Sequence, residues 1–206
     1  MTDRVEREVK LHAAASLVLP DLGADGDFVV EPLAPRLLDA TYYDSADLQL
    51  LGRGITVRRR TGEGTRWTVK FPTEELAAAG GLSRREVDLA TEELDPPTGV
   101  VDLVGSSLDG AELVPVARLV SRRARQRVAG RDGRLVAEID DDRVTVFAPG
   151  AEVEVGGFRE IEVEFGADAD DSAVVAVVDR LLAAGSARAG ATSKVGRALD
   201  LLGHRR

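Results

Sequence analysis

Apolar and charged residues alternate with a period of two along most of this chain of 206 residues. In the first such segment Val9 and Leu11 hold one parity, while Glu8 and Lys10 hold the other. Successive side chains of a β-strand point to opposite faces of a sheet, so the pattern predicts strands. It recurs in several segments, at 4–12, 55–60, 66–71, 84–89, 135–140 and 160–165, with further strand candidates at 35–44 and 118–128. We therefore expect a mainly β protein with antiparallel strands.

Helical patterns are few and short. Residues 172–184 follow Asp170 and Asp171, which can cap a helix, and they end at Gly185. Further helices are expected at 96–108 and 193–202, and a short one at 14–22, where Pro20 disturbs the pattern. No internal repeat or low-complexity tract divides the chain, and 44% of it is hydrophobic. Residues 1–206 are therefore expected to form one α+β domain.

Composition excludes several kinds of site. The sequence has no cysteine and only two histidines, His12 and His204. Thiolate metal sites and a cysteine nucleophile are therefore excluded. A Ser-His-Asp triad is nearly impossible because so few histidines are present. A metal site would have to use carboxylates, which suit a hard ion such as Mg²⁺ or Mn²⁺. A net charge of −9 argues against a nucleic-acid partner.

No segment predicts a membrane location. The longest uninterrupted apolar run, at 173–178, is far too short to span a bilayer. The first residues are charged and lack the apolar core of a secretory signal. We therefore expect a cytoplasmic protein with no membrane partner. A monomer and a homodimer both remain open.

The polar faces of these strands are unusually rich in ionisable residues. The ordinary interpretation is that each polar face is solvated. A sheet that closes into a barrel would instead turn the polar faces inward and leave the apolar faces for helices to cover. Arginine and lysine suit phosphate oxygens, and clustered carboxylates suit divalent cations, so such a lumen would bind a metal–polyphosphate. The alternative is a lipocalin-like carrier with apolar residues inside, in which Glu6 and Arg58 would face solvent.

A series of short motifs resembles the CYTH family, named for class IV adenylate cyclases and thiamine triphosphatases and placed among the triphosphate tunnel metalloenzymes. The first motif, Glu6-Arg7-Glu8-Val9-Lys10, has the family's form Glu-x-Glu-x-Lys. The others follow in the family's order, as Tyr42-Tyr43-Asp44-Ser45, Gly54-Ile55-Thr56-Val57-Arg58-Arg59-Arg60, Trp67-Thr68-Val69-Lys70, Arg84-Arg85-Glu86, Glu138-Ile139-Asp140, Glu162-Val163-Glu164 and Ser193-Lys194. Together they run from residue 4 to about residue 200.

The resemblance implies a closed eight-stranded antiparallel β-barrel, or tunnel, with helices packed outside. It also implies that different lumen residues bind the phosphates and the metal. Six basic residues would hold the phosphates, namely Arg58, Arg60, Lys70, Arg84, Arg122 and Lys194. The metal ligands would be Glu6, Glu8, Glu162 and Glu164, with Asp140 and Glu138 nearby. Lys10 would act with Glu6 and Glu8 where attack occurs, and Glu86 would be a further lumen residue.

One strand departs from the family pattern. Family members often carry Lys or Arg two residues before the position matched by Arg122, but this chain has Val120 there. The run at 121–127 carries arginine on both parities, which leaves the register of that strand open. Arg123, Arg125 and Arg127 are accordingly as well explained by a solvated strand face as by function.

The implied activity is divalent-metal-dependent hydrolysis of a triphosphate. Inorganic triphosphate is the favoured substrate because no motif for reading an organic group is visible. Trp67 shares the parity of Val69 and Phe71, away from Lys70, so it is expected to be a packed aromatic that does not stack on a ligand. Alternatives are a thiamine triphosphatase, an adenylate cyclase of the same family, and a polyphosphate-binding module without catalysis.

Overall fold

The computed structural model describes residues 1–62, 64–190 and 192–204. The strands are β1 (Thr2–Ala13), β2 (Phe28–Asp44), β3 (Thr56–Thr61), β4 (Arg66–Ala77), β5 (Gly81–Ala90), β6 (Val114–Gly130), β7 (Leu135–Phe147), β8 (Glu154–Phe165) and β9 (Ala187–Arg188). The helices are α1 (Gln49–Gly52), α2 (Thr98–Val104), α3 (Asp171–Ala183) and α4 (Lys194–Leu201), with short 3-10 turns η1 (Ala78–Gly80) and η2 (Gly105–Ser107).

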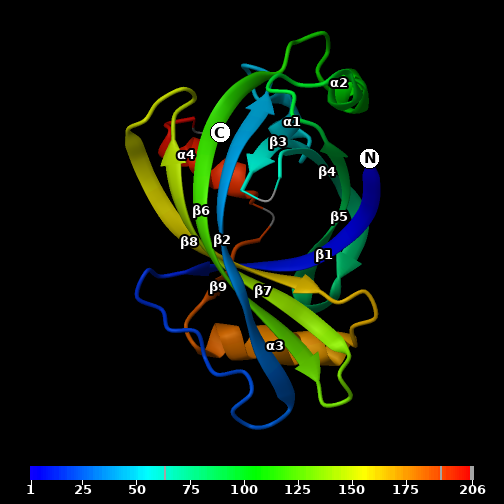
Figure 1. Cartoon of the computed structure of the whole chain (residues 1–206), viewed down its shortest axis with the longest axis vertical. Helices are drawn as coiled ribbons and strands as arrows, with labels where there is room; N and C mark the ends of the chain where they lie inside the picture. The colour runs from blue at the N-terminus through cyan, green and yellow to red at the C-terminus, as the bar shows by residue number, and fades with distance from the viewer. Residues whose placement is uncertain (63, 191, 205–206) are drawn as a thin grey trace.

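Eight of these strands form one closed antiparallel barrel. Around the ring they follow the order β5-β4-β3-β2-β6-β7-β8-β1, and β1 pairs again with β5 to close it. The ring can be followed in Figure 1, with β6 on the left and β4 and β5 on the right. The short strand β9 pairs with β1 through Leu11 and His12. The predicted eight-stranded antiparallel barrel is therefore confirmed.

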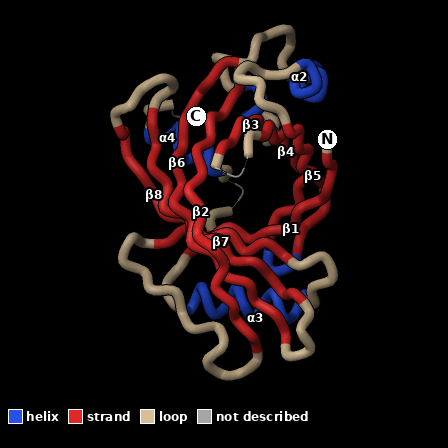
Figure 2. The backbone as a smooth tube through the Cα atoms, in the orientation of Figure 1, coloured by secondary structure: helices blue, strands red, loops and turns tan. Residues whose placement is uncertain are grey.

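Helices cover the apolar outer faces of the strands, as predicted. Along β1, β7 and β8, Leu11, Ile139 and Ile161 are buried in one cluster with Val177 and Leu181 of α3. Figure 2 shows α3 running along the lower part of the sheet. On β3 and β4 the outer residues form a second cluster with α2, made up of Leu50, Ile55, Val57, Trp67, Val69, Val100, Val104 and Leu108. Because α2 and α3 cover the apolar outer faces of these strands, the ionic faces line the interior.

Helix α4 packs differently, against residues of the inner face at one end of the barrel. Tyr42 and Ala117 lie directly opposite each other on β2 and β6, so they share a face. Both are buried in one cluster with Val195, Ala198 and Leu199 of α4. The side chain of Ser193 caps the helix by accepting a hydrogen bond from the Gly196 N–H. Consequently the start of α4 faces the barrel interior.

The helix predictions are mostly confirmed. The helix expected at 172–184 is α3, capped by the Asp170 carboxylate, which accepts from the N–H groups of Ser172 and Ala173. Residues 193–202 form α4, and 96–108 contains α2 followed by η2. The helix expected at 14–22 was wrong, because this segment forms turns before Pro20 and after it. None of the helices in the described residues is long and apolar enough to cross a membrane.

Asp44 ties the end of β2 to α1. Its carboxylate accepts hydrogen bonds from the backbone N–H groups of Ser45, Leu50 and Leu51, at 2.7, 2.8 and 2.9 Å. Because the change Asp44→Ala leaves these buried donors without an acceptor, we expect it to lower the free energy of unfolding by about 3 kcal/mol. Urea unfolding measures this, with Asp47→Ala as the exposed control expected to change it by less than about 0.5 kcal/mol. Equal effects of the two variants would contradict this role.

Candidate functional site

The barrel encloses a cavity of about 240 Å³ whose lining is almost entirely ionic. The lining residues come from all eight barrel strands and from the start of α4. They are Arg4, Glu6, Glu8, Lys10, Arg36, Tyr42, Thr56, Arg58, Arg60, Arg66, Lys70, Arg84, Glu86, Arg123, Arg125, Asp140, Glu162, Glu164, Ser193 and Lys194. Glu6 and Arg58 therefore face the interior, which excludes the lipocalin-like alternative.

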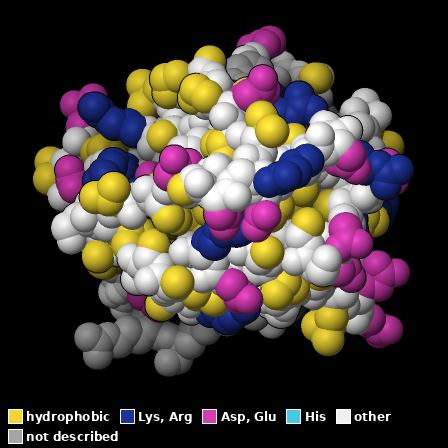
Figure 3. Space-filling model, turned by 90° about the horizontal axis from the view of Figure 1, so that it is seen from below, with side chains coloured by type: hydrophobic (Ala, Val, Ile, Leu, Met, Phe, Trp, Pro, Cys, Tyr) yellow, Lys and Arg dark blue, Asp and Glu magenta, His cyan; other side chains and the backbone are white. Residues whose placement is uncertain are grey.

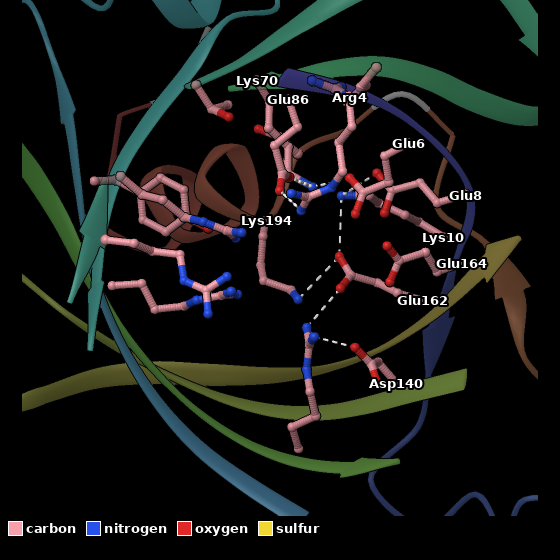
Figure 4. Close-up of a pocket in the computed structure, with 18 of the residues that line it drawn as sticks. Arg4, Glu6, Glu8, Lys10, Lys70, Glu86, Asp140, Glu162, Glu164 and Lys194 are labelled. Atoms are coloured by element: carbon pink, nitrogen blue, oxygen red, sulfur yellow. Dashed lines mark hydrogen bonds and ion pairs between the residues drawn. The ribbon is translucent and has the colours of Figure 1, made fainter. Parts of the chain in front are cut away.

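Positive charges outnumber negative charges in this cavity, and the two signs gather mainly on different strands. Eleven of its described lining residues are basic and six are acidic, although the whole chain carries a net charge of −9. Figure 4 shows Glu6, Glu8, Glu162 and Glu164 gathered on one side, on β1 and β8; we call these four the acidic wall. Arg36, Arg58, Arg60 and Arg66, on β2, β3 and β4, form what we call the arginine wall. On the outer surface in Figure 3, basic and acidic side chains are instead interspersed.

Two carboxyl groups of the acidic wall share a proton. Glu6 and Glu164 form a side-chain hydrogen bond with each other. Burial and the neighbouring Glu6 raise the pKa of Glu164 to about 8. Burial works against ionisation of Glu6 as well, but Lys70 outweighs it and lowers the pKa of Glu6 to about 2. At neutral pH the pair therefore holds one proton and one negative charge.

Each lysine of the cavity is bracketed by carboxylates. Lys10 Nζ lies 3.2 Å from Glu8 Oε1 and 3.3 Å from Glu162 Oε1. Lys70 forms ion pairs with Glu6 and, at 2.7 Å, with Glu86. Figure 4 also shows Lys194 directed at Glu162, at 3.2 Å. These contacts fix three ammonium groups around the acidic wall.

The same carboxylates keep Lys10 charged. Burial opposes its ionisation, but Glu8 and Glu162 outweigh burial and raise the pKa of Lys10 above its ordinary value. Lys194 is raised in the same way by Asp142 and Glu162 against the effect of burial. Both side chains are therefore fixed positive charges at physiological pH, and neither is a base.

Three arginines of the cavity have hydrogen-bond donors that are not satisfied within the described part of the chain. Arg58, Arg60 and Arg84 each have a buried Nε atom without a hydrogen-bond partner in the described part of the chain. The nearby Arg58, then burial, then Arg123 lower the pKa of Arg60 to about 10. Buried donors without acceptors and crowded cations both cost free energy, and a bound polyanion would relieve both.

The structure corrects the placement of Arg122. Its side chain is exposed and lies outside the cavity, facing Arg143 across the outer surface of β6 and β7, whereas Arg123 and Arg125 line the interior. In the register that the sequence left open, Arg123 faces inward together with Leu119, which has the same parity and packs beneath α4. An apolar residue here does not mark the outer face.

Two further differences concern the edges of the site. Glu138 is not part of the cavity lining; it pairs with Arg125 at 2.7 Å and its side chain is 33% exposed. Arg4 and Arg66 were missed, although both continue the polar parity of their strands. Arg36 gave no such signal, because a register shift between Leu33 and Arg36 interrupts the alternation of β2.

Arg123 joins the carboxylates of three positions. Its guanidinium pairs with Asp140, with Asp142 at 2.6 Å and with Glu162 at 2.8 Å. Removing one partner leaves buried charges uncompensated, so we expect Arg123→Gln to lower the free energy of unfolding by about 3 kcal/mol or more. Urea unfolding checks this, and Arg122→Gln is the matched control on the adjacent, outward position. A larger loss of unfolding free energy in Arg122→Gln than in Arg123→Gln would contradict the placement of Arg123 inside the barrel.

The donor chemistry of the acidic wall fits a divalent cation, but its present arrangement is not a finished cage. All the candidate ligands are carboxylates, the ligands that Mg²⁺ and Mn²⁺ take, and Glu6 and Glu164 hold a proton that a cation can replace. No group of three or more acidic or histidine side chains in the described residues already surrounds a metal position. Binding a cation therefore requires the ion pair of Lys70 with Glu6, or of Lys10 with Glu8, to loosen.

Comparison with known proteins places this geometry in a family. The CYTH domain matches residues 5–193. Two uncharacterized proteins of Mycobacterium tuberculosis, from strains CDC 1551 and H37Rv, are each 32% identical over 211 residues, which cover 95% of this chain and 40% of theirs. The chain thus spans about two fifths of the length of these curated relatives.

Solved structures share the fold at low sequence identity. A Bacillus halodurans protein provisionally described as an adenylate cyclase has a TM-score of 0.60 and 19% identity, covering 96% of this chain and 98% of its own. A provisionally described adenylyl cyclase from Hippeastrum, reported to have a dominant triphosphatase activity, has a TM-score of 0.58 and 18% identity, covering 95% of each chain.

Proposed function

Because the chain belongs to the CYTH domain family, we propose that it hydrolyses a triphosphate in a divalent-metal-dependent reaction inside the barrel. The observation that carries this proposal is the cavity itself, where eleven basic residues face six acidic ones inside an acidic protein. Such a surplus of buried positive charge favours a compact polyanion. The family's general dependence on divalent metals and the triphosphatase activity reported for the Hippeastrum protein support the same reaction.

The arginine wall and the lysines would bind the phosphates. Arg58, Arg60 and Arg84 offer guanidinium donors that match phosphate oxygens, and Lys70 and Lys194 add point charges. Phosphoryl transfer asks mainly for positioning and neutralisation of charge, which these side chains can supply without a covalent step. The absence of cysteine is compatible with this chemistry.

The acidic wall would hold the metal. Glu6, Glu8, Glu162 and Glu164 are the residues that would bind Mg²⁺ or Mn²⁺, with Asp140 beside them. The metal would supply charge neutralisation and an activated water. Lys10 lies within this wall and stays protonated, so its role is to stabilise negative charge at the phosphorus that is attacked, and Glu86 keeps Lys70 in place.

The described lining of the cavity offers little apolar surface to an organic group. Among the described residues that line it, only Tyr42, Thr56 and Ser193 are uncharged. Trp67 is fully buried on the outer face of β4, where its ring lies 4.8 Å from that of Tyr43. An inorganic triphosphate needs no further pocket, so it is the proposed substrate ahead of thiamine triphosphate or ATP.

A second candidate is a polyphosphate-binding module without turnover. It is favoured by the ion pairs that already occupy Glu6 and Glu8, since a permanent lysine partner would keep a metal out. A panel of inorganic, thiamine and nucleoside triphosphates, assayed for released phosphate with Mg²⁺ or Mn²⁺ at neutral and alkaline pH, separates the two. We expect metal-dependent release, greatest for inorganic triphosphate. Tight binding with no release from any of them would favour the binding module.

A further inference from the structure

Glu160 is a buried carboxylate that the proposed mechanism leaves unused. Its side chain is fully buried, and it is not among the described residues that line the cavity. It has the parity of Glu162 on β8, and it lies directly opposite His12 of β1 and Asp142 of β7. Residues of one parity, and directly opposite residues of an antiparallel pair, share a face of the sheet. Glu160 is therefore on the inner face of the barrel, next to the cavity but outside its lining.

Glu160 bridges the two basic residues of α4. Its Oε1 lies 3.6 Å from Lys194 Nζ, and its Oε2 lies 3.7 Å from Arg197 Nη1. Residues three apart in a helix are neighbours on one side of it, so a single carboxylate reaches both. The Arg197 guanidinium also stacks over the Phe158 ring of β8, 4.1 Å from its centroid. Each oxygen of the Glu160 carboxylate therefore faces its own cation on α4.

The ammonium group of Lys194 lies among three carboxylates. It pairs with Asp142, with Glu160 at 3.6 Å and with Glu162 at 3.2 Å. Of these three, only Glu162 is in the described lining of the cavity, and Figure 4 shows Lys194 directed at it. Glu162 is also a proposed metal ligand, so a bound cation would compete with Lys194 for it. Asp142 and Glu160 would then be the carboxylates that keep Lys194 in place.

The charge of Glu160 cannot by itself favour a phosphate ligand. A carboxylate and a phosphate repel each other, and the repulsion is strong where water is excluded. A lysine side chain, in contrast, is a flexible stem whose ammonium group must be immobilised before it binds well. At metal sites, the partners that orient the ligand side chains are worth about 10- to 100-fold in affinity or activity. Glu160 can therefore strengthen phosphate binding only by acting on Lys194.

We propose that Glu160 is a positioning residue, which holds the Lys194 ammonium at the wall of the cavity so that it can bind a phosphate oxygen. This rests on the proposed binding of phosphate by Lys194. Asp142 also pairs with Arg123, a second lining residue, whereas the other partner of Glu160, Arg197, is not in the described lining. Replacing Glu160 therefore tests the orientation of Lys194 more cleanly than replacing Asp142.

The first test is a double-mutant cycle on triphosphate binding. Isothermal titration in EDTA gives the affinity for linear triphosphate of the unaltered chain, Glu160→Gln, Lys194→Met and the double variant. We expect Glu160→Gln to bind about tenfold more weakly than the unaltered chain. The double variant should bind no more weakly than Lys194→Met alone, because Glu160 then has no lysine to orient. Tighter binding by Glu160→Gln, or a further loss in the double variant, would overturn the positioning role.

Glu160→Asp separates geometry from charge, and it covers the case in which Glu160→Gln does not fold. The change keeps the negative charge but withdraws the carboxylate from Lys194 by one methylene group. We expect the affinity for triphosphate to fall by about tenfold here too, since the ammonium loses its fixed partner. Glu154→Gln, an exposed change on the same strand, should leave the affinity as in the unaltered chain. Unchanged affinity in Glu160→Asp would overturn the positioning role.

These measurements separate the role of Glu160 from the proposed hydrolysis. Triphosphate binding that Glu160→Asp weakens supports the role, even where no phosphate is released and the proposed hydrolysis fails. Metal-dependent phosphate release with the same kcat/KM in Glu160→Asp and in the unaltered chain would overturn the role and leave the proposed function intact.

Discussion

Glu6→Gln is expected to lower metal-dependent phosphate release from triphosphate by about 100-fold or more, the loss typical of an essential part of a metal site. The change removes a carboxylate from the acidic wall and from its hydrogen bond with Glu164. It also removes one of the two carboxylate partners of Lys70 and leaves its ion pair with Glu86. The measurement is the initial rate of phosphate release at increasing Mg²⁺ concentrations.

The matched control is Glu154→Gln. Glu154 is an exposed residue near the start of β8, the strand that carries Glu162 and Glu164. It lies outside the cavity lining, so the variant should retain the full rate and the same Mg²⁺ dependence. A Glu6→Gln protein that folds normally and keeps its activity would show that the acidic wall is not needed for phosphate release.

Arg58→Gln is the second change with a large expected effect. Arg58 is buried inside the cavity, with a side-chain hydrogen bond to Tyr42 and an Nε without an acceptor. Loss of a pre-organised charged donor to phosphate is expected to lower kcat/KM by about 100-fold. Arg59→Gln is the control on the next residue, which points to the outer face opposite Trp67. Equal losses in the two variants would contradict the assignment of the inner face.

Replacing the neighbouring Arg60 with Gln should raise the stability of the protein and lower its activity. Its positive charge is disfavoured by Arg58 and by burial, which lower its pKa to about 10. Without ligand, Arg60→Gln is therefore expected to raise the melting temperature, by about 2–4 °C for each kcal/mol of repulsion removed in a chain of this size. The same variant should lose activity on polyphosphate. Calorimetry in phosphate-free buffer checks the first effect, and a lower melting temperature would argue against crowding.

Much of the fold follows from the period-two alternation. Lys10 shares its parity with Glu6 and Glu8, Lys70 shares its parity with Arg66, and all of these line the barrel interior. Trp67 has the opposite parity and is buried outside it. Alternation predicts faces well where helices cover only the outer surface, since every apolar residue then marks the same side.

The prediction fails where that condition fails. On β6 the inward-facing Leu119 packs under α4, so apolarity does not identify the outer face. Alternation therefore could not correct the family resemblance, which placed the exposed Arg122 inside. On β2 a register shift brings Arg36 to the cavity without any periodic signal. Contacts between residues far apart in sequence, such as Glu6 with Glu164, depend on which strands pair, here β1 with β8, and cannot be read from one strand.

The proposed metal and phosphate sites are tested most directly by locating a metal and a polyphosphate in the same crystal. We expect a Mn²⁺ anomalous peak against Glu6, Glu8, Glu162 and Glu164 when the protein is crystallised with Mn²⁺ and a non-hydrolysable imido-linked triphosphate. The phosphates should lie between that peak and the guanidinium groups of the arginine wall. Phosphate density on the outer surface, with the lysine–carboxylate pairs of the cavity unchanged and no metal between them, would contradict the proposed sites.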